Sequence, residues 1–333
     1  MAQPSSHDIL NEFRAHLRSE GVCRRNFEDK PFYHPESVKS WLTQTAREGE
    51  ASNTGKLLWA VFEPYDAQFT PVTTDQISHD HPLVFAILAD MDCGHMIRDF
   101  MTSMQDSYLN MTNISGLYNP IMDSMANDKV EVPDGYRKGG YRAVMEAFDE
   151  RRWAFVPPLL QLRMDKNICY QKCILPFFYK KFINTGGTSR VYHCKIQVDL
   201  VQGELAKILE PSKKTDPTYG DYYELAVKSY MSEYADVYKM ESNAFIGMQG
   251  QEGLEVVKYL GAYHTDGGRH SHHIMLEYGE QDLDEYLADT SPPVLNKEII
   301  DFWESLFKVA HTLERIHILN HRRVDGNMQL FNG

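Results

Sequence analysis

The second half of the chain contains two glycines and a lysine whose types and spacing are suited to holding a phosphate group. Gly186 and Gly187 stand between segments rich in β-branched and aromatic residues. A turn there lets backbone N–H groups approach a ligand closely, because glycine has no side chain. Lys228 follows a short apolar run, and it points to the opposite side from Val227 if that run is a strand. An ordinary hairpin turn and an exposed strand lysine explain each feature taken alone, so the interpretation depends on their neighbours.

The most informative neighbour is a glutamate in the segment after Lys228. Apolar residues at helical spacing around Glu241 predict a helix over 232–247. Glu241 falls on the apolar side of that helix, where a carboxylate is out of place unless it is paired. Glu233 is the competing partner, but it falls in the first turn, where it stabilises the helix dipole. We therefore predict an ion pair between Lys228 and Glu241.

Five strands are predicted to position these residues. Segments rich in β-branched and aromatic residues indicate the strands, and apolar residues at helical spacing indicate two later helices, at 283–287 and 297–318. Residues 199–223 are rich in Pro, Lys, Asp and Gly, and we expect them to form an inserted, partly disordered loop. The expected strands are 181–184, 191–198, 225–230, 256–263 and 273–278.

The first 173 residues are predicted to form a mainly helical region without recognisable chemistry. Apolar residues recur at helical spacing near the start of the chain, after Pro35 and over 141–152. The apolar run at 81–90 fits a strand or a helix by periodicity, and a proline at a first-turn position favours the helix. A polar stretch then extends to about Gly140. We place the domain boundary between residues 173 and 174.

The order of these elements resembles the N-lobe and hinge of a protein kinase over residues 175–330, about half of the chain. The turn near Gly186 is similar to the glycine-rich loop, although Asn184 and Ser189 stand where the family has glycines. The resemblance implies an α+β fold, in which the helical N-terminal region precedes a five-stranded antiparallel sheet with one helix, a hinge and the first C-lobe helices. It also implies that Glu241 pairs with the third-strand lysine. The implied nucleotide-binding residues are Gly186, Gly187, Ser189, Val191, Ala226, Lys228, Leu276 at the gatekeeper position, Glu277 and Gly279.

The resemblance is to the kinase-like proteins of filamentous fungi, and it implies ATP as the ligand. Phosphoryl transfer in protein kinases needs a catalytic aspartate and magnesium ligands further along the sequence. Here Arg323 stands where the aspartate belongs, and the chain ends at Gly333 before a His-x-Asp-x-Lys segment. We expect a truncated serine/threonine-type kinase domain, a pseudokinase that binds ATP without a catalytic loop. The alternative is a non-catalytic interaction or scaffold protein on a degenerate N-lobe, and a third interpretation is a helical protein with a chance sheet of unrelated function.

Composition bounds the class of protein. The 333 residues are 42% hydrophobic and 24% charged, which predicts folded units, and no apolar stretch reaches the ~20 residues of a membrane helix. The net charge of −13 and the pI near 5.5 oppose nucleic-acid binding, because phosphate contacts need clustered Lys and Arg. The arginine pairs at 24–25, 151–152 and 322–323 are predicted to be solvated surface pairs.

Cysteine and histidine spacing gives no metal or disulfide framework. The five cysteines lack a CxxC pair, and the start of the chain lacks a secretory signal, so we expect reduced thiols in an intracellular protein, cytoplasmic or nuclear. His270, His272 and His273 are spaced as in an exposed turn rather than as metal ligands. The predicted partners are therefore ATP and another protein, with no nucleic acid, membrane or metal.

Overall fold

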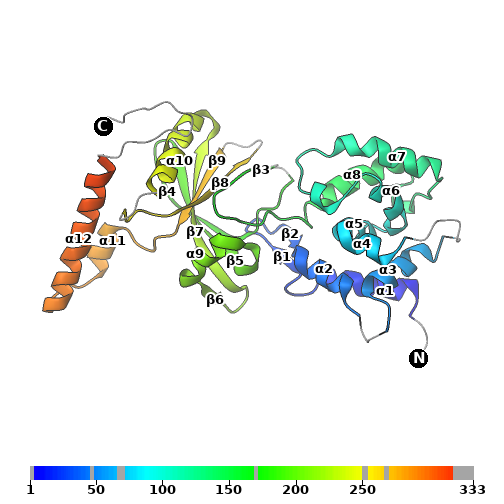
Figure 1. The fold of residues 1–333 in the computed structure, drawn as a ribbon, viewed down its shortest axis with the longest axis horizontal. Coiled ribbons are helices and arrows are strands. Elements are labelled where there is room, and N and C mark those ends of the chain that lie inside the picture. Colours follow the sequence, from blue (N-terminus) through cyan, green and yellow to red (C-terminus); the bar gives the residue numbers. More distant parts are fainter. Residues whose placement is uncertain are drawn as a thin grey trace. The chain divides into compact units, whose positions relative to one another are not determined.

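The computed structural model describes residues 4–45, 49–65, 72–168, 172–249, 254–265 and 270–317 (Figure 1). The chain divides into two compact units. The first comprises Met1–Leu159 and Gln171–Pro176, and the second comprises Leu160–Tyr170 and Phe177–Gly333. Residues 160–170, expected in the helical region, belong to the second unit because a strand forms there and joins its sheet. In the described part of the chain, no helix combines the length and apolar character needed to cross a membrane.

The first unit is helical, with one small antiparallel hairpin. The helices predicted near the start of the chain, after Pro35, over 81–90 and over 141–152 are confirmed. A further helix forms within the stretch read as polar before Gly140, where Ile121 and Met125 are buried one turn apart. The elements are α1 (Ser6–Leu17), β1 (Cys23–Arg25), β2 (Pro31–Tyr33), α2 (Pro35–Thr43), α3 (Asn53–Phe62), α4 (Thr74–Asp80), α5 (Pro82–Asp90), α6 (Ile97–Met101), α7 (Tyr118–Asn127) and α8 (Gly140–Arg152), with short 3-10 turns η1 (Gly94–Met96), η2 (Asp106–Tyr108), η3 (Ser115–Leu117) and η4 (Asp134–Tyr136).

Helix α5 is the centre of this unit. All of its residues from Pro82 to Ala89 are buried, which explains why its sequence is apolar on every side. Its first turn is capped by a carboxylate from another segment, since Asp106 accepts hydrogen bonds from the N–H groups of Leu83 and Val84, both at 3.0 Å. The cap satisfies donors that a buried helix start would otherwise leave without acceptors.

The arginine pair at 151–152 corrects a prediction, because these side chains do not form a solvated surface pair. Arg152 is completely buried at the end of α8. Its guanidinium donates to Asp149 Oδ1 at 2.9 Å and to the carbonyl oxygens of Met111, at 2.9 Å, and Leu109. Arg151 pairs with a carboxylate of α5 and a tyrosine hydroxyl. Composition alone could not indicate this, since the acceptors come mainly from a loop about 40 residues earlier in the chain.

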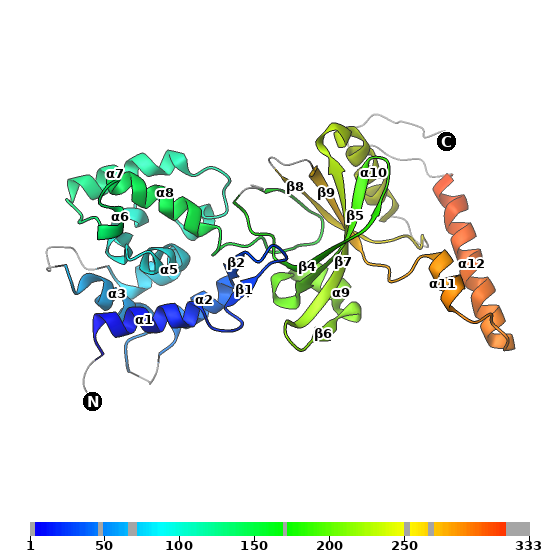
Figure 2. The ribbon, with the colours of Figure 1, turned by 180° about the vertical axis from the view of Figure 1, so that it is seen from behind.

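The second unit is built on a mixed seven-stranded sheet, which corrects the expected five-stranded antiparallel one. Its strand order is β3-β8-β9-β7-β5-β4, and β6 pairs with β7. Only the β3–β8 pair is parallel among these described strands. Figure 2 shows β4, β5 and β7 side by side. The strands are β3 (Met164–Ile168), β4 (Phe177–Thr185), β5 (Ser189–Gln197), β6 (Lys214–Asp216), β7 (Gly220–Met231), β8 (Tyr259–Thr265) and β9 (His270–Glu277).

The five predicted strands all overlap strands of this sheet, and the two additional strands have separate origins. β3 forms in a segment assigned to the helical region, and β6 forms inside the predicted loop 199–223. That loop is ordered: it contains η5 (Val198–Leu200), α9 (Gly203–Leu209), η6 (Glu210–Ser212) and the start of β7. Buried Leu200, Leu205 and Leu209 anchor it, so its polar composition concealed a small apolar side.

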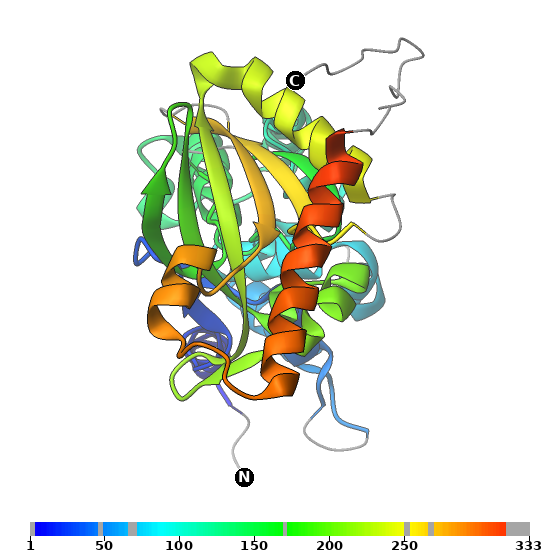
Figure 3. The ribbon, with the colours of Figure 1, turned by 90° about the vertical axis from the view of Figure 1, so that its left-hand side faces the viewer.

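Three helices complete the second unit. α10 (Ala235–Gln249) follows η7 (Ser232–Tyr234) and lies over one face of the sheet (Figure 3). There Tyr238 of α10 joins a buried cluster with Tyr230, Tyr259, Ala262 and Ile274 of the sheet. The last two helices, α11 (Leu283–Asp289) and α12 (Asn296–His317), begin close to residues 283 and 297 as predicted.

Candidate functional site

Strand register brings most of the predicted site residues to one face of the sheet. Lys228 of β7 pairs with Val191 of β5, and Ala226 of β7 pairs with Leu276 of β9. Directly paired residues point to the same face, and alternate residues along a strand share a face. Val191, Ala226, Lys228 and Leu276 therefore share one face, which is also the face that α10 contacts.

The ion pair predicted between Lys228 and Glu241 is present. Lys228 Nζ donates to Glu241 Oε1 at 2.5 Å, and the two side chains retain 25% and 28% of their exposure. An ammonium has three N–H donors, so this bond leaves Lys228 with donors for another acceptor. Burial, reinforced by the nearby Glu241 carboxylate, raises the pKa of Tyr230, which keeps its phenol neutral beside the pair. The pair is thus positioned by α10 and β7 but remains partly accessible.

The glycine turn between β4 and β5 is short and open. The N–H of Gly186 donates to the carbonyl of Ser189 at 2.9 Å, which closes the turn. A side chain added at Gly187 would meet nothing within 4 Å, so the backbone there is free to be approached. Asn184 belongs to β4 and lies outside the positive-φ region, so its tolerance of that region is not used. Ser189 starts β5 and is buried, which separates it from the exposed tip of the turn.

The predicted hinge follows β9. One of its backbone N–H groups is hydrogen-bonded within the described residues, and another is not. The N–H of Glu277 donates to the carbonyl of Lys258 at 2.9 Å, and its carboxylate accepts from Lys258 Nζ at 3.1 Å. The N–H of Gly279 has no acceptor among the described residues. Leu276, before them, packs against the cluster under α10. The hinge therefore offers a backbone donor beside an apolar side chain.

An aromatic pair that sequence reasoning missed lies beside the hinge. His193 pairs with Ala226 across β5 and β7, so it shares the face that carries Lys228. The ring of Tyr278 stacks on the His193 imidazole, with centroids 3.9 Å apart and planes 5° from parallel. The signal was available, since His193 stands two residues after Val191 in a predicted strand and alternation places both on one face. A flat aromatic surface thus borders the predicted adenine-binding residues.

Glu224, also on β7, lies next to the His193–Tyr278 pair and interacts with two lysines. Its carboxylate accepts from Lys214 Nζ at 2.6 Å and lies 3.4 Å from Lys195 Nζ and 3.2 Å from His193 Nε2. Burial opposes its ionisation, but Lys214 and the neighbouring cations outweigh burial and lower the pKa of Glu224. Burial lowers the pKa of His193, which favours its neutral form. Glu224, Lys214 and Lys195 thus form a charged end to the face on which Lys228 lies.

The histidines before the hinge are not an exposed turn, because they belong to β9. His273 is buried, and its Nδ1 lies 2.8 Å from Ser229 Oγ. His272 stacks on Tyr238 of α10 and lies 2.7 Å, Nδ1 to Nδ1, from His264. Within the described ranges, no group of three or more His, Cys, Asp or Glu side chains is arranged to hold a metal. His272 and His273 therefore pack within the second unit.

Comparisons with known proteins add no family assignment. No family model matches the chain, and no curated protein matches it. Arg323, predicted from the kinase resemblance to replace a catalytic aspartate, lies outside the described residues. The functional interpretation therefore depends on the chemistry of the sheet face.

Proposed function

We propose that the second unit is a kinase-like N-lobe of the serine/threonine type that binds ATP on the sheet face carrying Lys228. One observation carries the proposal: a partly exposed lysine of β7 is held by a glutamate of α10 on the same face as Val191, Ala226 and Leu276. A lysine paired in this way meets the α- and β-phosphates in protein kinases. The proposal concerns the binding of the nucleotide by these residues.

The phosphates and the base of ATP each have a chemically matched group at this site. The remaining donors of Lys228 suit phosphate oxygens, and the open turn at Gly187 lets backbone N–H groups approach them. Val191 and Ala226 offer apolar contact to a base, and the free N–H of Gly279 offers it a hydrogen bond. In binding of this kind, backbone groups form the hydrogen bonds to the base, so different side chains are tolerated at the hinge.

Thermal unfolding with and without ATP tests the proposal, because a ligand of the folded state raises the midpoint by mass action. We expect ATP to raise the midpoint of the full chain, with and without Mg²⁺, and Lys228→Met to remove most of that shift. Lys207→Met is the matched control, since Lys207 forms an exposed pair with Glu204 on α9. No shift with wild-type protein, or an equal shift in Lys228→Met, contradicts nucleotide binding at this face.

A scaffold function is the second candidate, and the last two helices favour it. Val294, just before α12, and Phe307, within it, are 78% and 68% exposed, and α11 exposes Leu283 and Leu287 as well. Exposed apolar side chains grouped on neighbouring helices are typical of protein-binding surfaces. An absent ATP shift together with specific binding of a protein partner, lost on Phe307→Ser, would establish this function in place of nucleotide binding.

A further inference from the structure

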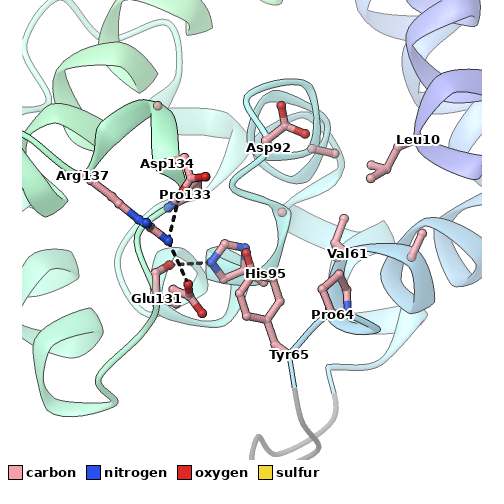
Figure 4. A pocket seen from close by; sticks show the side chains of 14 residues that line it. Leu10, Val61, Pro64, Tyr65, Asp92, His95, Glu131, Pro133, Asp134 and Arg137 are labelled. Carbon is pink, nitrogen blue, oxygen red and sulfur yellow. Dashed lines mark hydrogen bonds and ion pairs between the residues drawn. The ribbon is translucent and has the colours of Figure 1, made fainter. Parts of the chain in front are cut away.

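A pocket of about 480 Å³ opens in the first unit, where the sequence gives no chemistry (Figure 4). Its apolar walls come from α1 and α3, and its floor comes from the segment after α5. Gly94 is needed at that floor, because a side chain there would meet Val61 Cγ1 at 2.5 Å. The volume lies within the usual range of small-molecule pockets, about 300–1,000 Å³.

His95 lines this pocket, and only one of its two ring nitrogens is hydrogen-bonded to a described residue. The side chain is 6% exposed, and its Nε2 lies 2.8 Å from the carbonyl oxygen of Glu131. A carbonyl only accepts hydrogen bonds, so Nε2 carries the proton and Nδ1 of the neutral ring is an acceptor. No described residue forms a hydrogen bond with Nδ1. Nδ1 keeps some accessible surface, because it is not one of the fully buried side-chain atoms that lack a partner. Tyr65 stacks on the ring with centroids 4.0 Å apart, which fixes its orientation.

Burial keeps this imidazole neutral, because it lowers the pKa of His95 more strongly than Glu131 and Asp99 raise it. The unprotonated nitrogen of a neutral imidazole accepts a hydrogen bond, and no described residue donates to it here, so a ligand in the pocket can. The pocket therefore favours a ligand with an N–H or O–H group directed at His95.

The charged residues at the rim select among such ligands. Three carboxylates, from Asp92, Glu131 and Asp134, line the pocket with a single guanidinium, from Arg137. Arg137 lies 2.7 Å from Asp134 Oδ1 and 3.5 Å from Glu131 Oε1, so its charge is already compensated. Asp92 is likewise paired with Arg14, whose Nη2 lies 2.5 Å from its Oδ1, so three carboxylates face two guanidinium groups. The one remaining negative charge favours cations over anions.

We propose that this pocket binds the protonated nitrogen of an organic cation, an ammonium or guanidinium group on a short apolar stem. The nitrogen donates to His95 Nδ1 between the rim carboxylates, and the stem packs on Val61, Pro64 and the ring of Tyr65. A free amine and a Lys or Arg side chain of a peptide share this chemistry. The proposal is independent of nucleotide binding, which concerns the other unit.

Titration of the full chain with benzylamine tests this assignment. Calorimetry measures the affinity, and the side-chain nitrogen NMR signals of ¹⁵N-labelled histidine report on His95. We expect benzylamine to perturb the His95 Nδ1 signal and to bind at least about tenfold more tightly than benzyl alcohol, a difference of about 1.4 kcal/mol. His95→Phe should weaken benzylamine binding about tenfold or more, while His79→Phe, at an exposed position on α4, should leave it unchanged.

Two further experiments test the proposal if the His95→Phe variant folds poorly. Asp134→Asn changes an exposed rim carboxylate, and it should weaken benzylamine but not benzyl alcohol. Nα-acetyl-lysine amide, in place of benzylamine, separates the sources: comparable binding assigns a peptide side chain, and weaker binding assigns a free amine. Equal binding of the amine and the alcohol, or no change of the His95 signal, overturns the proposal.

Discussion

The two units each hold a basic side chain next to a carboxylate, but they do so in opposite ways. Arg152 of the first unit is completely buried, donates to Asp149 and two backbone carbonyls, and lies with its guanidinium carbon 4.0 Å from the ring centroid of Trp153. Lys228 of the second unit has one acceptor, Glu241, and keeps a quarter of its exposure.

This difference separates a structural cation from a binding cation. A buried cation whose acceptors come from several segments fixes those segments to one another, and a ligand has no access to it. A partly exposed cation held by a single partner retains donors, and its contribution to folding is modest. Charge and pairing alone do not distinguish the two roles, whereas accessibility does: Arg152 also has a donor without an acceptor, Nη2, but that nitrogen is buried.

The largest expected effect is on the buried cation. Arg152→Met should lower the free energy of unfolding of the first unit by about 3–5 kcal/mol, because it leaves two carbonyls without their donor and Asp149 with Lys172 as its remaining cation. Urea unfolding followed by tryptophan fluorescence measures this loss. Lys228→Met is the matched change in the other unit, with an expected loss of about 1 kcal/mol or less. Equal losses in the two variants would remove the distinction drawn between these cations.

The helix caps of α5 and α11 allow the same comparison between the two units, with smaller expected losses of stability. Asp106→Ala should cost about 2 kcal/mol, because it leaves the buried N–H groups of Leu83 and Val84 without an acceptor. Asp282 caps α11 by accepting from Glu285 N at 2.8 Å in an exposed setting, so Asp282→Ala should cost about 0.5 kcal/mol. Chemical denaturation of both variants checks the ratio. A larger loss in Asp282→Ala would contradict the burial argument.

One partly buried carboxylate, of Asp106, and one buried carboxylate, of Glu224, should give opposite pH dependence. Burial raises the pKa of Asp106 to about 6, so its contribution to stability is fully present below its unfolded value near 3.8 and is lost as pH rises through about 6. The pKa of Glu224 is lowered, so its contribution is present above its unfolded value near 4.5 and is lost as pH falls through the folded pKa.

The measurement is urea unfolding of wild type, Asp106→Asn and Glu224→Gln between about pH 3.5 and 6.5, with differences of about 1 kcal/mol expected. As the pH falls, the stability of wild type relative to Asp106→Asn should increase, and that relative to Glu224→Gln should decrease. Slopes of the same sign would show that burial does not govern both groups.

The smallest effect on stability is expected on α12. Its apolar side chains include Trp303 and Phe307, which are more than half exposed, whereas those of α5 are buried. Trp303→Ser with Phe307→Ser should change the free energy of unfolding by about 0.5 kcal/mol or less and should reduce self-association. Light scattering at high protein concentration measures the association. A monodisperse wild-type monomer under these conditions would contradict the expected association through this surface.

Sequence reasoning identified local elements where periodicity and capping agreed. The apolar run of α5 began with proline and is a helix, and the face shared by Val191, Ala226 and Lys228 follows from strand alternation. The Lys228–Glu241 pair was predictable because a carboxylate on an apolar helix side requires a partner. The helix and the shared sheet face depend on residues close in sequence, and the ion pair depends on the single contact between Lys228 and Glu241.

The rest depended on contacts between distant segments. β3 is stabilised by pairing with β8, about 100 residues later, and nothing within 164–168 distinguishes it from the helical region before it. The burial of Arg152 depends on carbonyl groups, which sequence patterns do not record. The His95 pocket likewise requires a loop carbonyl at residue 131 and a stacked ring at residue 65, so no motif could have indicated it.

Hydrogen exchange with and without ATP tests the central claim most directly, because it locates a ligand on the chain. The proposed site predicts slower exchange of backbone amides at 186–191, 226–228 and 277–279 in wild type, with Lys207→Met protected equally. In Lys228→Met this protection should be lost while the remaining amides exchange as in wild type. Unchanged exchange across these three segments at saturating ATP, or protection confined to the first unit, would contradict nucleotide binding on the Lys228 face.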